Sequence, residues 1–557
     1  MSKRKKENTD LRWPWLDKLL VKFKVSDAGR AEVQQILREP IVWLKGEYMV
    51  FGQLAPWEKL IFFIQGFTQT ASEQWTWGRD RLYRYTYNVN PNMLTVSGII
   101  TSLWDAFNDP FIGQWMDRHP MKDSTHRRIV RINHNVGVLM GFFFLFDLGL
   151  TPVQRMVMYT VMVCVKDILG TMRDVSFAKF YAGITPYSAE RGRAMVWEGV
   201  GAQTGYPFGN IPAYILGFVK DRQTWSDYRV YTRGYAITMP LMICTGIIAT
   251  FVRNRVQFQM EAKADAPDMQ AEPTAMETKQ APEEPKLSIK ESLAVLKHNK
   301  FVIYGTIANL VTMLTPGFDM YPVIRFMFPE RKAPKFLQNL LGPTIRGEGY
   351  MTLSKQISGI PITFLYPFRK VITDKIGGPK RMMVAFCLTQ IAMGLVRWGF
   401  GYKSVAALVM MILTDTVNET MGPFNGYASG ILRYEMFDYV EYKTGVRSEG
   451  ITMAFESFVN KIIANNLNHL TGNAFMAWSG IHEIDVNAAK PVVPERFEKY
   501  AWPMATLTMA ADAAIMLASR MAFPYDPAQK DVIEADLKER RALAQAKIAE
   551  IKEETLS

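Results

Sequence analysis

Apolar blocks of membrane-spanning length recur along this chain of 557 residues. Each block is roughly 20 residues long, which is what a helix needs to cross the hydrocarbon core of a bilayer. Inside that core the backbone must satisfy its own hydrogen bonds, and a helix does so within a single segment. The blocks therefore predict an all-α membrane protein.

Charged residues gather outside these blocks, in the first 56 residues, in the segment 253–300 and in the tail after Phe523. The mean hydropathy of −0.04 averages over both kinds of segment, so it does not indicate a soluble protein. The net charge of +12 is what Lys and Arg in cytoplasmic loops produce, and we expect no nucleic-acid partner. Cys164, Cys244 and Cys387 lie inside apolar blocks, which predicts small buried side chains and no disulfide or metal framework.

Twelve spans are predicted, in two groups of six. Lys and Arg cluster in the amino-terminal segment and in the loops after spans two and eight. Because positive charge concentrates on the cytoplasmic side, both termini and the even-numbered loops are predicted to be cytoplasmic, in a multi-pass protein of the plasma (inner) membrane. The spans are 57–77, 93–116, 129–150, 155–181, 194–219, 235–252, 301–328, 351–372, 382–400, 405–432, 451–478 and 500–523.

The segment between spans six and seven divides the chain into two halves. Its central part, 264–285, is rich in Ala, Pro, Glu and Lys and is predicted to be disordered. Two six-span halves with similar charged ends on spans two and eight follow the repeat pattern of transporters, whose site lies between the halves. The predicted units are an N-terminal extension (1–56), an N-terminal half (57–253), a cytoplasmic linker (254–300), a C-terminal half (301–523) and a charged helical tail (524–557).

Both ends of the chain are predicted to be cytoplasmic and partly helical. The segment 3–24 sets Trp15, Leu16 and Leu20 among lysines, which fits a helix on an anionic membrane surface or a short soluble helix. The tail is mostly Ala, Glu, Lys, Arg and Leu, which favours a plain solvated helix over a regulatory element.

Two carboxylates stand inside the second predicted span. Asp105 and Asp109 are four residues apart with Asn108 between them, so a helix puts all three on one face. An ionised carboxylate at this depth costs several kcal/mol unless it faces a cavity or a partner. Pro110 also leaves the carbonyl of Ala106 without its helical donor. The stretch predicts a cation site, and the apolar segments on both sides disfavour a solvated loop helix.

Other predicted spans carry polar residues as well. Any one of them could serve a hydrogen bond between helices. Polar faces on several spans together predict a polar central cavity. The set includes Gln65, Gln69, Thr70 and Glu73 in span one, Asp167, Thr171, Arg173 and Asp174 in span four, Asp415, Asn418 and Glu419 in span ten, and Glu456, Lys461, Asn465, Asn466, Asn468 and His469 in span eleven.

Several of these residues stand in runs that resemble a known family. The run DAFNDPFIG (105–113) resembles the second-helix motif of the glycoside–pentoside–hexuronide cation symporters, the melibiose permease branch of the major facilitator fold. The run FDYVEYKTGVRSE (437–449) resembles their signature between helices ten and eleven. TMRD (171–174) and FVNK (458–461) fit two further family positions. The resemblance covers about 57–523.

The resemblance implies two six-helix major-facilitator halves and a sodium or proton site in the N-terminal half. The positions of that site read Asp105, Asn108, Asp109 and Thr171 here, and all four match the family. Carboxylate, amide and hydroxyl oxygens are hard donors that suit a small cation. One of two neighbouring carboxylates can instead take up a proton, because like charges repel.

The substrate positions of the family match less well. The helix-four acid and the helix-eleven Lys are kept, but the helix-one Lys-Asp pair is replaced by Gln-Thr, and several large positions become small. This implies a wider cavity and a larger or different substrate, unless an offset of one or two residues brings other side chains into the site. The candidate substrate residues are Asp174, Lys461, Gln69, Thr70, Glu73 and Trp104.

Charged residues at the cytoplasmic ends of both halves are candidates for an inner gate. Salt bridges there would hold the gate shut, whereas ordinary surface pairs would contribute little. The gating candidates are Asp117, Arg118, Asp374, Lys375, Asp438, Glu441 and Arg447.

The sequence thus predicts a monomeric secondary transporter that couples Na⁺ or H⁺ to the symport of a sugar or glycoside. A cation-coupled carrier of lysolipids or other amphiphiles on the same fold is the alternative. A receptor or scaffold on a transporter fold is disfavoured, because the extensions are short and charged. No Ser/His/Asp, metal or phosphate-loop constellation predicts an enzyme, and no cofactor besides the coupling cation is expected. Small-molecule substrate and membrane lipid are the expected partners.

Overall fold

The computed structural model describes Pro14–Lys22 with a few residues after it, 54–209, 228–252, 296–524 and parts of 529–540. Short gaps and some side chains within these ranges, those of 72–80 among them, are outside the description. The predicted disordered segment 264–285 and Arg447 also lie outside the described residues.

Long helices make up nearly all of the described chain, and each predicted span overlaps at least one of them. The first group is α3 (Pro56–Arg81), α4 (Pro91–Arg118), α5 (Asp123–Phe143), α6 (Pro152–Gly183), α7 (Ser188–Gly209) and α9 (Tyr228–Ile247) with the short helix η3 (Ile248–Phe251). The second group is α12 (Lys300–Thr312), α13 (Met320–Met327), α15 (Gly347–Leu365), η5 (Tyr366–Phe368), α16 (Arg369–Ile376), α17 (Pro379–Phe400), α18 (Val405–Thr444), α19 (Glu449–Phe458), η6 (Val459–Ala464), α20 (Asn465–Ser479) and α21 (Glu495–Ala522).

The helices begin and end at residues that suit those positions. Asn90 caps α4 through its side chain and is followed by Pro91, whose missing N–H is not needed there. Thr151 and Gln154 form a reciprocal capping box at the start of α6. Gly445 ends α18 with a φ of 71°, a left-handed conformation that favours glycine.

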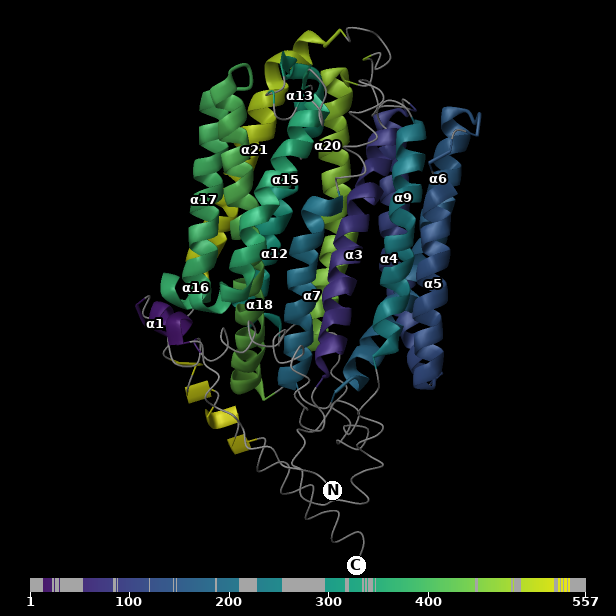
Figure 1. The fold of residues 1–557 in the computed structure, drawn as a ribbon. Helices are drawn as coiled ribbons and strands as arrows, with labels where there is room; N and C mark the ends of the chain where they lie inside the picture. Colours follow the sequence, from purple (N-terminus) through teal and green to yellow (C-terminus); the bar gives the residue numbers. More distant parts are fainter. Residues whose placement is uncertain are drawn as a thin grey trace, which may run out of the picture.

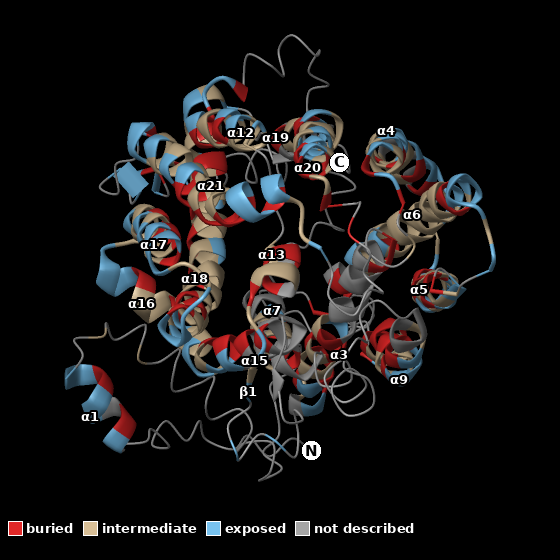
Figure 2. Cartoon of the chain, turned by 90° about the horizontal axis from the view of Figure 1, so that it is seen from above, coloured by how far each residue is buried: buried red, intermediate tan, exposed pale blue. Residues whose placement is uncertain are grey.

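The two groups of helices lie side by side in the bundle (Figures 1 and 2). Each half has buried apolar clusters of its own, which include Phe62 and Phe180 in the first half and Phe424 and Leu432 in the second. Outside the helices, β1 (Arg331–Lys332) and β2 (Thr344–Ile345) pair as a short antiparallel ribbon in the loop after α13.

Three helical stretches of the described chain are long and apolar enough to cross a membrane on composition alone. They are Thr232–Phe251, Pro379–Phe400 and Glu495–Ala522. Other predicted spans, such as α4 and α6, carry charged and amide side chains that lower their hydropathy. Helices that turn a polar face toward a bundle interior have this composition.

Four predicted spans differ from single straight helices of the expected length. Span seven is divided between α12 and α13, and span eight bends at η5 before α16. Span eleven contains the π-helical segment η6 between α19 and α20. Span ten is longer than predicted, since α18 continues 12 residues past its expected end at Leu432, to Thr444.

Both predicted terminal helices contact the bundle. Leu16 and Leu20 of α1 (Pro14–Lys22) are buried against Phe368 and Val371 of η5 and α16, while Trp15 is exposed. Ile533 and Leu537 of the tail are also buried. Lys530 pairs with Glu435 of α18 at 2.8 Å, and Arg540 Nη1 donates to the carbonyl of Tyr442 at 3.4 Å. The described part of the tail therefore packs on α18 instead of standing alone in solvent.

Within the N-terminal half, α3 and α7 touch backbone to backbone through glycines. A Cβ atom at Gly66 would lie 1.9 Å from the carbonyl oxygen of Glu198, and one at Gly201 would lie 1.9 Å from that of Phe63. Gly205, one turn after Gly201, faces the backbone of Phe67 in the same way. Small residues at this spacing let membrane helices approach closely, so the two helices form a tight pair.

Between the halves, α4 packs on α20 and η6, and α7 packs on α15. Asn473 Nδ2 donates to Thr95 Oγ1 at 2.9 Å, and the ring of His469 lies against Gly98. Thr363 Oγ1 donates to the carbonyl of Gln203 at 3.3 Å. These contacts between the halves are made largely by polar side chains.

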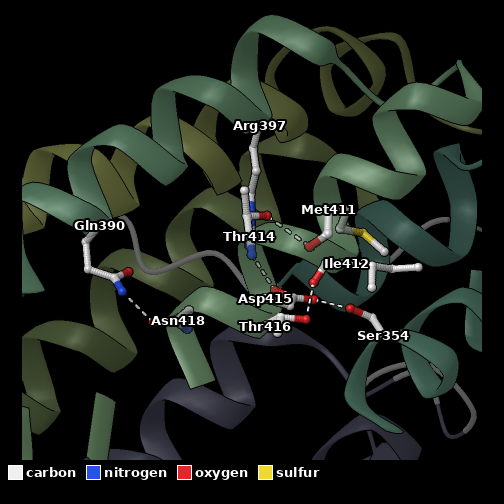
Figure 3. A network of polar contacts seen from close by, with 9 residues as sticks. All are labelled: Ser354, Gln390, Arg397, Met411, Ile412, Thr414, Asp415, Thr416 and Asn418. Carbon is white, nitrogen blue, oxygen red and sulfur yellow. Dashed lines mark hydrogen bonds and ion pairs between the residues drawn. The ribbon is translucent and has the colours of Figure 1, made fainter. Parts of the chain in front are cut away.

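A buried ion pair joins two helices of the C-terminal half (Figure 3). Arg397 of α17 pairs with Asp415 of α18, and their side chains are 7% and 18% exposed. Arg397 Nε also donates to Thr414 Oγ1 at 2.6 Å, and Ser354 Oγ of α15 donates to Asp415 Oδ2 at 2.5 Å. The network therefore joins three helices. Removing one charge would strand the other in a low-dielectric interior.

Gly201→Ala is expected to destabilise the protein by roughly 1–3 kcal/mol, because the added methyl group would force α3 and α7 apart. Gly426→Ala on α18 is the control, since a Cβ atom there meets nothing within 4 Å. The control should leave stability unchanged or raise it by up to about 1 kcal/mol. Thermal unfolding of the purified variants in detergent is the measurement. Equal melting temperatures for Gly201→Ala and wild type would contradict the close contact.

Arg397→Met should lower stability by roughly 3–5 kcal/mol, because Asp415 would keep a buried charge without its partner. The double variant Arg397→Met with Asp415→Leu removes both charges and should recover most of that loss. The same melting assay compares the single and double variants. A double variant less stable than Arg397→Met would show that the pair itself, and not the stranded charge, controls stability.

Candidate functional site

One lysine reaches from the C-terminal half to the two acids of α4. Lys461 Nζ lies 2.9 Å from Asp105 Oδ2 and also donates to Asp109 Oδ2. The acids are one helical turn apart, so a single ammonium group spans both. The side chains of all three residues are partly buried. This bridge links the halves near the middle of α4.

The π-helical segment explains how Lys461 comes to face α4. It interrupts the helix between α19 and α20 at Val459–Ala464, and Lys461 lies within it. Such a bulge carries an extra residue per turn and is frequent at functional sites. It changes the direction of the side chains relative to a continuous helix. The contact of η6 with α4 is therefore not one that helical spacing alone predicts.

The other two predicted cation-site residues, Asn108 and Thr171, join the same cluster through hydrogen bonds. Thr171 Oγ1 of α6 donates to Asp109 Oδ1 at 2.6 Å. Asn108 Nδ2 lies 3.4 Å from Thr171 Oγ1 and donates to Asp167 Oδ2 at 3.1 Å. The structure thus brings Asp105, Asn108, Asp109 and Thr171 together. That they bind a cation stays a prediction.

Asp167 is the member of this cluster that the sequence did not assign to the site. It lies one turn before Thr171 on α6, and that spacing is the signal that could have identified it. With it, the cluster holds three carboxyl groups and one ammonium group, and Lys461 pairs with two of the three. Among the described residues, no group of three or more His, Cys, Asp or Glu side chains is arranged as a metal site. The cluster instead combines carboxyl, amide and hydroxyl groups.

A cavity of about 620 Å³, lined by polar and apolar side chains, adjoins the cluster within the N-terminal half. Asp167 lines it and also accepts the hydrogen bond from Asn108, so one carboxyl group belongs to both. Helices α3, α5, α6, α7 and α9 form the walls. The polar and charged side chains that line it are Gln65, Gln69, Asn133, His134, Lys166, Asp167, Arg173, Asp174, Glu198, Tyr235 and Thr245.

Two of the candidate substrate residues, Gln69 and Asp174, line this cavity. Asp174 is exposed and pairs with its neighbour Arg173. Trp104 Nε1 donates to the carbonyl of Cys164 at 3.1 Å, so this side chain lies against α6. Thr70 lies on α3 but is not among the lining residues, and Lys461 lies with the cation-site residues. The side chain of Glu73 is outside the described residues.

The gating candidates lie at helix ends. Arg118 ends α4, and Asp374 and Lys375 lie in α16; all three are exposed. Asp438 and Glu441 are half-buried on the extended end of α18. Arg447 and the side chain of Asp117 are outside the described residues. The inner-gate salt bridges stay a prediction.

Several solved transporters resemble the structure at low sequence identity. The nucleoside transporter NupG matches with a TM-score of 0.47 and 13% identity over 84% of this chain and 100% of that chain. A D-xylose-proton symporter matches with a TM-score of 0.49 and 11% identity over 82% and 96%. A POT family transporter in complex with a thioalcohol conjugated peptide matches with a TM-score of 0.46 and 10% identity over 83% and 94%. No curated protein is significantly similar to the chain in sequence.

The sequence profile of the MFS/sugar transport protein family matches 80–310 and 342–495, which is more than half of the chain. The match includes α4, α6 and the run 437–449, on which the resemblance to the melibiose permease branch rests. The protein therefore belongs to the MFS/sugar transport protein family, is a multi-pass membrane transporter of small molecules, and is not an enzyme.

Proposed function

We propose that the protein is a secondary transporter that couples a small cation, Na⁺ or H⁺, to the symport of a sugar or glycoside by alternating access. The bridge from Lys461 to Asp105 and Asp109, beside a polar cavity, is the observation that carries this proposal. A positive group already occupies the position that a coupling cation would take. Ammonium and coupling cation are thus competitors for the same oxygens.

Cation binding would replace the Lys461 ammonium group with Na⁺ or H⁺ at Asp105 and Asp109. Sodium would take oxygen ligands from Asp105, Asp109, Asn108 and Thr171, and a proton would bind one of the two carboxylates. Either event weakens the ion pairs between Lys461 and the two acids, because the acids then have another positive partner. The released ammonium can turn toward a substrate in the cavity. Loading the site therefore removes this ion-pair link between the halves and leaves their hydrogen bonds and packing contacts.

The same bridge accounts for the return of the empty carrier. Unpaired carboxylates are costly inside a membrane protein, so an empty site with bare acids would resist closure. Lys461 neutralises charge there when no cation is bound. The empty carrier can then reorient, as can the carrier with cation and substrate both bound. A carrier loaded with cation alone leaves the ammonium unpaired, and this difference couples the two fluxes.

The proposal includes the finer organisation expected from the sequence. Twelve spans would form two six-helix halves, with both termini cytoplasmic and the protein a monomer in the plasma membrane. Salt bridges among the gating candidates would close the inner side. The polar lining of the cavity, with Gln65, Gln69 and Asn133, favours a hydroxyl-rich solute over the acyl chain of a lysolipid. Uptake of labelled glycosides and of lysolipids by proteoliposomes, with and without a sodium gradient, separates the two.

Asp109→Asn should abolish cation dependence, because it removes a charge that both Lys461 and Thr171 contact. Thermal stability of purified protein is measured in NaCl and in choline chloride at equal ionic strength, and again as a function of pH. Wild type should be stabilised by sodium or by a change in pH, and the variant by neither. Glu498→Gln, an exposed change on α21, is the control and should behave as wild type. A sodium or pH response in Asp109→Asn equal to that of wild type would refute the assignment.

Lys461→Gln should strengthen cation binding while coupled uptake is lost. Without the ammonium group, a cation no longer competes for Asp105 and Asp109, and an apparent affinity about tenfold higher corresponds to about 1.4 kcal/mol. The sodium or proton concentration at half-maximal thermal stabilisation is the measurement. Lys332→Gln, at an exposed lysine of β1, is the matched control. Weaker cation binding in Lys461→Gln would mean that the lysine assists the cation instead of competing with it.

A further inference from the structure

Gln65 presents an unsatisfied acceptor at the wall of the cavity. Its side chain lines the cavity and the residue is only 6% exposed. Its Oε1 atom is buried, and no hydrogen-bond donor reaches it among the described residues. Leaving such an atom unpaired costs roughly 1–3 kcal/mol, and proteins seldom do so without a reason. A ligand that donates a hydrogen bond would remove this cost.

Glu198 lies directly across the helix pair from Gln65. The α3 backbone at Gly66, the residue after Gln65, touches the carbonyl of Glu198. Both side chains line the same cavity. In the part of the chain that the structure describes, no hydrogen bond or ion pair engages the Glu198 carboxyl group. Two side chains with acceptor oxygens therefore line the same cavity from adjacent helices, and no described donor reaches Gln65 Oε1 or the Glu198 carboxyl group.

The donors on the opposite wall are already engaged. Arg173 Nε donates to Asp174 Oδ1 at 2.8 Å, and Arg173 Nη1 donates to His134 Nδ1 at 3.1 Å. His134 Nε2 in turn donates to the carbonyl of Met242 at 2.8 Å. Asn133 Nδ2 donates to the carbonyl of Leu169 at 3.3 Å, and Lys166 also has a partner. The hydrogen-bond donors of Arg173, His134 and Asn133 therefore already bind acceptors of the protein.

We propose that Gln65 and Glu198 form a subsite, the α3–α7 subsite, that binds neighbouring hydroxyl groups of a neutral sugar or glycoside. The inference rests on the proposed transport function and specifies its substrate. Hydroxyl groups are donors, and amide and carboxylate oxygens are their acceptors. A carboxylate placed against Gln65 Oε1 and the Glu198 carboxyl group would meet only acceptors, so this subsite disfavours an anionic sugar such as a uronide. A cavity of about 620 Å³ is in the size range of small-molecule sites.

The test measures binding of named probes to the purified full-length protein in sodium chloride. The neutral probes are the methyl glycosides of glucose, galactose and xylose; the charged probes are methyl glucuronide and propylamine. Isothermal titration gives the affinity of each. At least one neutral glycoside should bind wild type, and Gln65→Leu and Glu198→Gln should each weaken it about 10- to 100-fold. Glu498→Gln should bind it as wild type does.

Three results would overturn the subsite. One is unchanged affinity in both variants for a neutral glycoside that binds wild type. Another is binding of methyl glucuronide or propylamine with no binding of the neutral glycosides. The third is that none of the probes binds.

The response to sodium and pH reports on the cation site separately. Gln65→Leu should keep the wild-type response of thermal stability to sodium and pH, and Glu198→Gln, which removes a titratable group, should keep the response to sodium; a cooperative transition also shows that they fold. If wild type responds but the variants bind glycosides normally, the subsite fails and the transport proposal stands. If wild type shows no response to sodium or pH, cation coupling itself fails, whatever binds in the cavity.

Discussion

The contact of one ammonium group with two carboxylates determines how the halves of this protein are related. Lys461 belongs to the C-terminal half, and Asp105 and Asp109 belong to the N-terminal half. In a low-dielectric interior such groups interact strongly, and none of them can remain alone without a large cost. Some positive species must therefore stay with the acids throughout a transport cycle. In the proposed cycle this species is either Lys461, which links the two halves, or a cation from solution, which does not.

The halves can move as bodies because they are held together internally in a different way. Within the N-terminal half, α3 and α7 touch through their backbones at Gly66 and Gly201. Within the C-terminal half, the ion pair of Arg397 and Asp415 is buried between helices. Between the halves, the described bonds are side-chain contacts that separate without opening an apolar core. Rigid units with an exchangeable polar interface suit a rocking motion.

Hydropathy and residue spacing were sufficient to predict most helices of the fold and the grouping of several polar residues around Asp105 and Asp109. Helices overlap all predicted spans, and Asp109 of α4 meets Thr171 of α6 as expected. The breaks in spans seven, eight and eleven were missed, because hydropathy averages over a window and does not register a bend. The prediction that Lys461 contacts substrate stays a prediction, and in this structure its long side chain joins the two acids. Its direction depends on the π-helical segment and on packing against α4, neither of which sequence spacing encodes.

Asp167 connects the predicted cation site with the cavity. Its carboxyl group accepts from Asn108, which also approaches Thr171, the residue that donates to Asp109. The same carboxyl group lines the cavity that Gln65 and Glu198 also line. Three hydrogen bonds in series therefore connect Asp109 with the cavity wall, through Thr171, Asn108 and the Asp167 carboxyl group. The proposed coupling between cation and sugar would require a shared group whose partners differ when the cation is bound. Asp167, the third acid beside Asp105 and Asp109, is the candidate for that shared group.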